Sequence, residues 1–145
     1  MVIVIFGESC TGKSTLAKAL LAQIPAECYT GRDYLRLAKS EAAAEAAFRA
    51  KLTEALSGGH VIYLCTEPKL LALVPEGAVR VLVTAELELI KTRFASRMRG
   101  VLPPPVAAML ERQHGVFDAE PHDVCVVSGK TTTEEACAKI LALLS

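Results

Sequence analysis

The stretch that decides the fold is VIVIFGESCTGKST, which runs from Val2 to Thr15. Its first five residues form an unbroken apolar run, which is typical of a β-strand buried on both faces. From Gly7 to Ser14 the chain has a glycine, four variable residues and then Gly-Lys-Ser, the pattern of a phosphate-binding loop. Glycines permit backbone conformations and close approaches that a Cβ atom resists. The pattern therefore predicts a loop that wraps a polyphosphate between a strand and a helix.

In such a loop the backbone N–H groups turn toward the anion, and the helix that follows directs the positive end of its dipole at it. We expect Lys13 to face solvent until it contacts the β/γ-phosphates, Ser14 to offer its hydroxyl to Mg²⁺, and Thr15 to contact the remaining phosphate. Glu8 is expected to point outward, because a carboxylate repels phosphate. ATP and Mg²⁺ are the expected cofactors. The predicted phosphate-binding residues are Gly7, Glu8, Ser9, Cys10, Thr11, Gly12, Lys13, Ser14 and Thr15.

The composition fits a single domain over residues 1–145, because the chain is long enough to bury a core and 52% of its residues are hydrophobic. Sixteen basic residues balance sixteen acidic ones, so no overall field favours nucleic acid or an anionic membrane as a partner. No apolar run approaches the ~20 residues of a membrane span, and the first residues lack a signal-peptide pattern. We therefore expect a cytoplasmic protein, and its oligomeric state stays open.

The five cysteines are odd in number and show no metal-ligand spacing, so we interpret them as reduced thiols. Cys10 has two interpretations. A thiol at a helix N-terminus beside Lys13 gains thiolate character, whereas a small residue at a variable loop position is a spectator. We interpret the histidines as structural, because His60, His114 and His122 share no spacing.

The rest of the chain alternates between strand and helix patterns. The predicted strands cover residues 2–6, 27–30, 60–65, 79–84 and 124–127, and the predicted helices cover residues 15–24, 35–57, 86–98 and 106–115, with a last helix opened by a capping box of Thr131 and Glu134. The prolines at 103–105 predict a turn or extended segment before the fourth helix. Five strands that alternate with helices predict an α/β fold with a parallel sheet.

Two further stretches resemble parts of known kinases. TGRDYLR, residues 30–36, resembles the Thr-Gly-Asp-x-x-Arg segment of adenylate kinases with one extra residue at Arg32, and VLVTA, residues 81–85, resembles the fourth strand of cytidylate and shikimate kinases. With the phosphate loop, the whole chain resembles small P-loop kinases of the nucleoside-monophosphate and shikimate kinase group. This resemblance implies a three-layer α/β/α P-loop NTPase fold with a five-stranded parallel sheet. It also implies an acceptor-binding region over about 30–57 and a short lid over about 97–108.

Arginines on both sides of the prolines are candidates to neutralise the charge that moves during phosphoryl transfer. Arg93 and Arg97 stand four residues apart and share a helix face, Arg99 ends that helix, and Arg112 lies on the next one. We expect Arg93, Arg97 and Arg99 to belong to the lid and Arg97 and Arg112 to act in catalysis with Lys13. For each arginine the alternative is a solvated surface charge.

The predicted acceptor site comprises Asp33, Arg36 and Glu67. Asp33 is a candidate to orient a hydroxyl acceptor or accept its proton, and its alternative role is a helix N-cap. Arg36 matches the adenylate kinase arginine that grips an acceptor phosphate, its alternative being a charge on an amphipathic helix, and Arg32 is a weaker candidate of the same kind. Glu67 is a candidate to orient a Mg²⁺-bound water, or else faces solvent at a turn. Thr66 is a less persuasive candidate for that role.

The segment that contains Glu67 departs from the family patterns. Cys-Thr-Glu-Pro-Lys, residues 65–69, replaces both the Asp-Gly-Phe-Pro-Arg of adenylate kinases and the glycine triplet of shikimate kinases. We therefore expect an ATP-dependent phosphotransferase that acts on a small-molecule acceptor, a nucleotide or nucleoside-like compound in the first instance. The alternatives are a hydroxyl-accepting enzyme similar to shikimate or gluconate kinase and a nucleotide-binding regulator without robust transfer.

Overall fold

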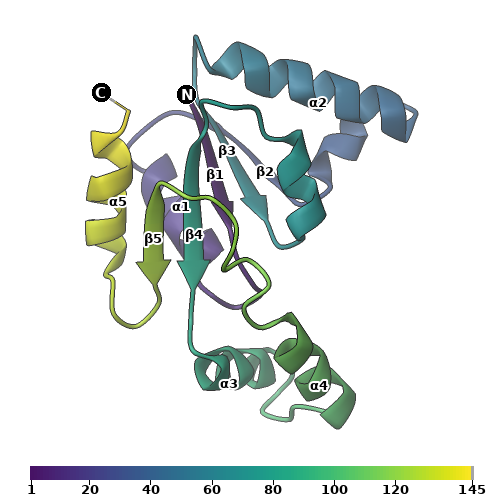
Figure 1. The fold of residues 1–145 in the computed structure, drawn as a ribbon, viewed down its shortest axis with the longest axis vertical. Helices are drawn as coiled ribbons and strands as arrows, with labels where there is room; N and C mark the ends of the chain where they lie inside the picture. The colour runs from purple at the N-terminus through teal and green to yellow at the C-terminus, as the bar shows by residue number, and fades with distance from the viewer. Residues whose placement is uncertain (145) are drawn as a thin grey trace.

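Five parallel strands form a single sheet in the order β2-β3-β1-β4-β5, as drawn in Figure 1 for the computed structural model, which describes residues 1–144. The strands are β1 (Val2–Phe6), β2 (Glu27–Thr30), β3 (Val61–Cys65), β4 (Val79–Thr84) and β5 (Val124–Val127). Every residue of β1 is fully buried, because this strand lies between β3 and β4 and is covered on both faces. The predicted five-stranded parallel sheet is confirmed.

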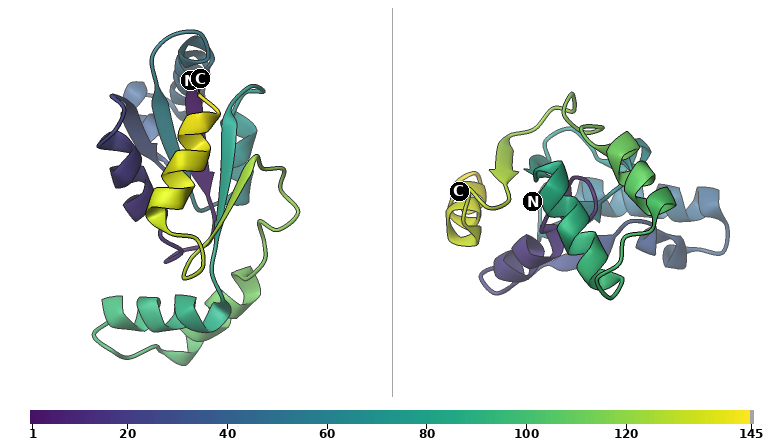
Figure 2. Two further views of the ribbon diagram at one scale, coloured as in Figure 1. Left: turned by 90° about the vertical axis from the view of Figure 1, so that its left-hand side faces the viewer. Right: turned by 90° about the horizontal axis from the view of Figure 1, so that it is seen from below.

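The two faces of the sheet carry separate apolar layers, because successive residues of a strand point to opposite sides. On one face, Ile3 and Ile5 pack with residues of α1 (Lys13–Leu21) and α5 (Thr133–Ala142). On the other face, Val4 and Phe6 pack with residues of α2 (Glu41–Ala55) and of the short 3-10 helices η1 (Asp33–Leu37) and η2 (Pro68–Leu73). Figure 2 shows the helices on either side of the sheet. This arrangement confirms the three-layer α/β/α architecture.

The remaining two helices, α3 (Leu87–Arg97) and α4 (Pro104–Gln113), form a hairpin that projects beyond the carboxyl ends of the strands (Figures 1 and 2). Its base packs against the phosphate loop through a small apolar cluster of Cys10, Ala85, Ile90 and Leu110. An ion pair between Lys91 Nζ and Glu111 Oε1, 2.7 Å long, joins the two helices. The predicted lid segment lies in this helical hairpin.

The single helix predicted over residues 35–57 is wrong. The chain forms η1, breaks at Ala38, which has extended dihedral angles of −156° and 169°, and starts α2 after Ser40. The hydroxyl of Ser40 accepts a hydrogen bond of 3.1 Å from Ala43 N, so this serine caps a new helix. Burial of Tyr34, which is 1% exposed and stacks on Phe48, holds η1 against the core.

Smaller differences occur at helix ends. Helix α1 begins at Lys13 and ends at Leu21 rather than covering residues 15–24. Helix α4 begins within the prolines, at Pro104, because a proline in the first turn needs no N–H donor. The cap of α5 is Thr132, whose hydroxyl accepts from Glu135 N at 3.1 Å, one residue beyond the predicted pair. The 3-10 helix η2 was not predicted.

Candidate phosphate, nucleoside and acceptor cavities

The phosphate loop starts where β1 leaves the sheet, and Gly7 occupies a position with no room for a side chain. Its N–H donates to the carbonyl of Cys65 at 3.2 Å. A Cβ atom at Gly7 would lie 2.1 Å from the main-chain oxygen of Val83. The loop also needs positive φ angles at Cys10, 61°, and at Gly12, 102°. The glycines of the motif are therefore required by close approach at one end and by backbone conformation at the other.

The N-terminus of α1 is open to an anion. Gly12 occupies the cap position without a side-chain hydrogen bond, and the first turn has no acidic residue. The free amide groups of this first turn and the positive end of the helix dipole therefore face a cavity of about 170 Å³, which we call the phosphate cavity. The exposed hydroxyl residues Ser14 and Thr15 lie on this first turn. The cavity is lined by Cys10, Thr11, Gly12, Lys13, Ser14, Thr15, Thr30, Leu64, Thr66 and Arg97.

Lys13 is 7% exposed, so the expectation of a solvent-facing ammonium group is wrong. The Lys13 Nζ donates to the main-chain oxygen of Glu8 and lies 3.5 Å from Thr11 Oγ1. Burial, with a smaller contribution from the positive charge of Arg97, lowers the pKa of Lys13 to about 8. The Lys13 side chain is therefore held against the backbone of the loop by its hydrogen bond to the Glu8 carbonyl.

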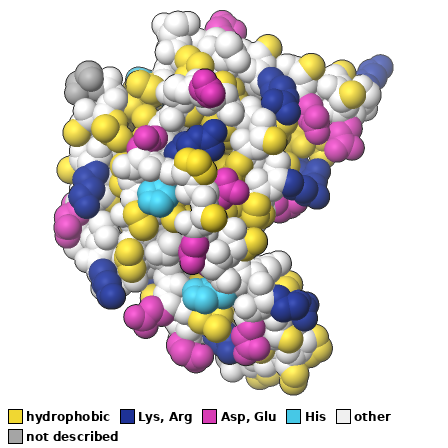
Figure 3. All heavy atoms as spheres, in the orientation of Figure 1, with side chains coloured by type: hydrophobic (Ala, Val, Ile, Leu, Met, Phe, Trp, Pro, Cys, Tyr) yellow, Lys and Arg dark blue, Asp and Glu magenta, His cyan; other side chains and the backbone are white. Residues whose placement is uncertain are grey.

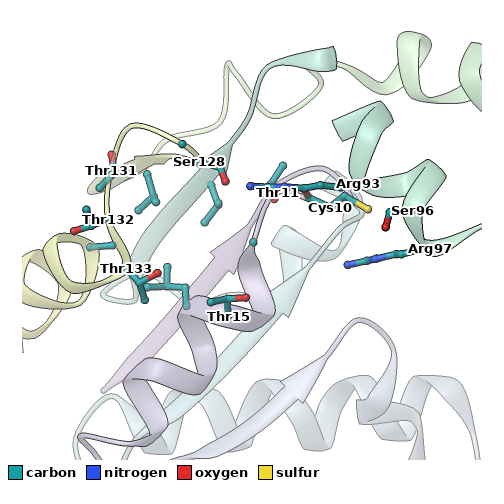
Figure 4. Close-up of a pocket in the computed structure, with 16 residues that line it drawn as sticks. Cys10, Thr11, Thr15, Arg93, Ser96, Arg97, Ser128, Thr131, Thr132 and Thr133 are labelled. Atoms are coloured by element: carbon teal, nitrogen blue, oxygen red, sulfur yellow. The ribbon is translucent and has the colours of Figure 1, made fainter. Parts of the chain in front are cut away.

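A larger cavity of about 540 Å³ lies between the phosphate loop, α3 and the connection from β5 to α5. Figure 4 shows Arg93, Ser96 and Arg97 of α3 near Cys10, and Ser128 with the threonines of the connection on the other side. Arg93 Nη1 donates to the carbonyl of Cys10 at 3.0 Å, and Arg97 also lines the phosphate cavity. The connection supplies the side chains of Ser128, Thr131 and Thr132, and α5 supplies that of its first residue, Thr133. The space has the size and the convergent polar groups of a small-molecule site.

A third cavity, of about 460 Å³, lies where η2 faces the segment after α4. Figure 3 shows the surface hollowed between the body that carries η2 and the lobe that carries α4. Thr66 lines both this cavity and the phosphate cavity, so the two spaces adjoin at the end of β3. The lining residues are Glu8, Thr66, Glu67, Pro68, Lys69, Gln113, Val116 and Phe117.

Glu67, one of the predicted acceptor residues, lines the third cavity. Its Oε2 is 3.3 Å from Arg32 Nη2 and 3.5 Å from Lys69 Nζ. The hydrogen bond from Arg32 is the largest cause that lowers the pKa of this carboxyl group, so Glu67 is ionised at neutral pH. Arg32 is therefore placed beside this carboxylate, and its other ion pair is with Glu41 at 3.9 Å.

The structure places the other two predicted acceptor residues differently. Asp33 Oδ2 accepts a hydrogen bond of 3.0 Å from Thr30 N, so its carboxylate holds the turn after β2. The Arg36 guanidinium lies over the ring of Tyr29, with its carbon 5.2 Å from the ring centroid. Neither residue is among those that line the three cavities.

Of the four candidate arginines on α3, α4 and the turn between them, two line a cavity and two do not. Arg93 and Arg97 line the 540 Å³ cavity, as their spacing on one helix face predicts. Arg99 is exposed in the turn after α3, with a φ angle of 63°. Arg112 is exposed on α4, and neither it nor Arg99 is among the residues that line the three cavities.

The expectation for Glu8 is wrong, and Cys10 has a packing role. Glu8 does not point outward: it is 9% exposed, and its carboxylate contacts His114 and Gly115. Cys10 is 6% exposed and packs with Ala85 and Ile90, so its side chain is part of the apolar base of the hairpin formed by α3 and α4. All five cysteines are unpaired, as predicted.

The residues that sequence reasoning missed lie at the end of an element or just after one. Gln113 is the last residue of α4, Val116 and Phe117 follow that helix, and Ser128 follows β5. The signal for the first group is Phe117, the aromatic residue of this segment, which is 2% exposed and packs on Phe6.

Within residues 1–144, no cluster of three or more His, Cys, Asp or Glu side chains is arranged to hold a metal ion. Over the same residues, the helices are all too short or too polar to cross a membrane.

No protein-family model matches the chain, and a comparison of its sequence with curated proteins finds no match. The fold is that of small P-loop kinases. A sugar kinase from Janibacter matches with a TM-score of 0.67 and 14% identity, over 99% of this chain and 93% of that one. A shikimate kinase from Acinetobacter baumannii in complex with shikimate gives 0.65 and 14%, over 99% and 92%. A gluconokinase from Sinorhizobium meliloti gives 0.62 and 18%, over 97% and 89%.

Proposed function

We propose that this chain is an ATP-dependent kinase that phosphorylates a hydroxyl group of a small metabolite. The observation that carries the proposal is the row of three adjoining cavities. The phosphate cavity shares Arg97 with the 540 Å³ cavity on one side and Thr66 with the 460 Å³ cavity on the other. A donor that binds across the first two spaces would present its terminal phosphate to an acceptor in the third.

The donor side fits ATP. The uncapped N-terminus of α1 and the loop amides suit the phosphates, and Lys13 would move from the carbonyl of Glu8 to the β/γ-phosphates. Arg97 would stabilise the charge of the transferred group, because its side chain borders both the donor and the phosphate cavities. Bound Mg²⁺ would neutralise phosphate charge, and the exposed Ser14 hydroxyl would hold it.

The acceptor side favours a hydroxyl group over a phosphate. Among the described residues that line the 460 Å³ cavity there is no arginine, and Lys69 is already paired with Glu67. An acceptor phosphate calls for cations, whereas a hydroxyl acceptor calls for a carboxylate that orients it. Glu67, beside Thr66, is the carboxylate we assign to that role. The proteins of similar fold named above as sugar kinase, gluconokinase and shikimate kinase support this choice.

The reaction joins the acceptor oxygen to the γ-phosphorus as the bond from that phosphorus to ADP breaks. The acceptor proton passes to the Glu67 carboxylate. A screen for ADP release tests the proposal, with nucleosides, nucleotides, sugars, sugar acids and other hydroxylated metabolites as acceptors. We expect release that depends on an acceptor without a phosphate. Release with nucleotides alone would favour a nucleoside-monophosphate kinase, and ATP binding without acceptor-dependent release would favour a regulator.

Substitutions at the acceptor side separate the two kinds of acceptor. With a hydroxyl acceptor, Glu67→Gln is expected to lower kcat by about 10²-fold, the usual scale for losing a general base, while ATP binding stays nearly intact. Arg36→Ala should then leave the KM of the acceptor unchanged, because its guanidinium is stacked on Tyr29. Steady-state kinetics on the identified acceptor give both values. A large KM increase in Arg36→Ala with normal turnover in Glu67→Gln would reverse the assignment.

The lowered pKa of Lys13 predicts a pH dependence of nucleotide binding. Below its pKa of about 8 the amine is charged and binds phosphate, and above it the free protein must first take up a proton. The affinity for a non-hydrolysable ATP analogue should therefore fall about tenfold from pH 7.5 to pH 9.5, because a charged partner is lost. Calorimetry at the two pH values measures this. The fall should be absent in Lys13→Met, and an equal fall in both proteins would contradict the assignment.

The lid hairpin is expected to become ordered around bound nucleotide. Arg97 lies at the end of α3, and the connection to α4 runs over exposed residues 98–101. The prolines stiffen the start of α4, so motion should concentrate in that connection. Hydrogen exchange of residues 97–108 should slow when Mg²⁺ and the ATP analogue are added. Unchanged exchange in this segment, at saturating nucleotide, would show that the hairpin is not a lid.

A further inference from the structure

Glu8 joins the phosphate loop to a segment that lies more than a hundred residues further along the chain. The Gly115 N–H donates to Glu8 Oε2 at 3.2 Å, and His114 Nδ1 lies 3.1 Å from Glu8 Oε1. The carboxylate is 9% exposed, so these two contacts hold it largely away from water. A buried carboxylate requires such partners, because its desolvation is costly. The side chain of Glu8 therefore fixes the position of residues 114–115 relative to the loop.

The main chain of Glu8 contacts the lysine that we assign to the phosphates of ATP. Its carbonyl oxygen accepts hydrogen bonds from Thr11 Oγ1, at 2.9 Å, and from Lys13 Nζ. The ammonium group must leave this carbonyl when it moves to a phosphate. ATP binding therefore removes a charge-assisted hydrogen bond from the peptide group of Glu8, while the side chain of the same residue stays bonded to residues 114–115.

The segment that Glu8 holds is a wall of the acceptor cavity. Gln113, Val116 and Phe117 line that cavity together with Glu8 itself. Phe117 packs on Phe6, the last residue of β1, with ring centroids 5.6 Å apart. Residues 113–117 are thus anchored twice, by Phe117 to the sheet and by Gly115 to the loop. A movement of the Glu8 peptide would therefore be passed to the cavity wall by the Glu8 side chain, which contacts residues 114–115.

We infer that Glu8 is a positioning residue that couples ATP binding to the shape of the acceptor cavity, so that each ligand strengthens the binding of the other. The inference rests on the proposed function for which cavity holds the donor and which the acceptor. The Glu8 carboxylate is not assigned to the phosphates, because it contacts His114 and Gly115 in the segment after α4, and only the N–H of this residue is left for an anion. Coupling of this kind is reciprocal, and its usual size is about 5- to 150-fold in affinity.

The test measures hydrogen exchange in the wall of the acceptor cavity itself, so it needs no identified acceptor. Hydrogen exchange of residues 113–118 is measured in the full chain with and without the ATP analogue AMP-PNP and Mg²⁺, for wild type, Glu8→Ala, Glu8→Gln and Glu76→Gln. The dissociation constant of AMP-PNP is measured for each protein. Glu76→Gln is the matched control, since Glu76 is exposed in the turn before β4, at the amino ends of the strands, whereas Glu8 lies at their carboxyl ends.

In wild type and in Glu76→Gln, AMP-PNP is expected to slow this exchange about fivefold or more. Glu8→Ala should lose the response while its dissociation constant stays within about threefold of wild type, because no phosphate contact is removed. Glu8→Gln should keep part of the response, since its amide oxygen can still accept from the Gly115 N–H. If Glu8→Ala does not fold, the test is whether AMP-PNP slows the exchange of residues 113–118 less in Glu8→Gln than in wild type.

Three results would overturn the inference: no response in wild type, an equal response in Glu8→Ala, or a loss of AMP-PNP affinity of about tenfold or more in that variant, which would make Glu8 a structural part of the loop. Failure of the proposed function is a different result. In that case no acceptor supports ADP release, although AMP-PNP binds and the response of residues 113–118 still depends on Glu8.

Discussion

Replacing Lys13 with alanine is expected to lower phosphoryl transfer by about 10²- to 10³-fold, the scale for removing one preorganised donor from a charge that develops in the transition state. ATP affinity should fall as well, because the lysine is the cation we assign to the β/γ-phosphates. The fold should survive. The Glu8 carbonyl keeps its hydrogen bond from Thr11, and a buried ammonium group is removed rather than left unpaired. Coupled ADP-release kinetics and calorimetry measure the two effects.

Lys18→Ala is the matched control for this prediction. Lys18 lies in the last turn of the same helix, is exposed, and does not line the phosphate cavity. Its substitution should change transfer and ATP affinity little. Equal ATP affinity in wild type and Lys13→Ala would remove the role assigned to the loop. Similar losses in both lysine variants would show a general effect of charge rather than a contact.

Gly7→Ala is expected to cost about 3 kcal/mol or more in the free energy of unfolding, or to prevent folding. The new Cβ atom would lie 2.1 Å from the main-chain oxygen of Val83, and backbone in the middle of a sheet cannot move aside as a side-chain end can. Urea unfolding followed by circular dichroism measures the loss. Nucleotide binding should fall with it, since the loop starts at this residue.

Gly58→Ala provides the control for the glycine position. Gly58 lies in the connection from α2 to β3, and a Cβ atom there meets nothing within 4 Å. The same change should therefore leave stability within about 1 kcal/mol of wild type. If Gly7→Ala were as stable as Gly58→Ala, β1 and β4 could not approach as closely as the structure has them.

The fold was predictable because its strongest signals are local. The apolar run of β1, the glycines of the loop and the alternation of strands with helices each follow from a few neighbouring residues. The break between η1 and α2 was not predictable in this way. Residues 35–57 are rich in alanine and favour a helix, and the break at Ala38 depends on the burial of Tyr34 against Phe48 and on the cap at Ser40.

The same difference between local signals and contacts of distant segments applies to the candidate site. The strand-loop-helix geometry of residues 2–21 was predictable by pattern, and the shared cavity of Arg93 and Arg97 by helical spacing. Contacts between distant segments were not. The charge of Glu8 favoured an outward side chain, but the Gly115 N–H and His114 meet it from the far end of the chain. Arg36 matched a family position, yet the ring of Tyr29 holds its guanidinium away from the cavities.

ATP labelled at the γ-phosphate shows whether its terminal phosphate is transferred to a small molecule. The full chain is incubated with this ATP, Mg²⁺ and pools of hydroxylated metabolites, and the labelled products are separated by chromatography, with Lys13→Ala as the inactive comparison. We expect the label to appear in an organic phosphate whose acceptor carried no phosphate before the reaction. Label that stays in ATP, or is found only in inorganic phosphate with every pool, would contradict the proposed kinase activity.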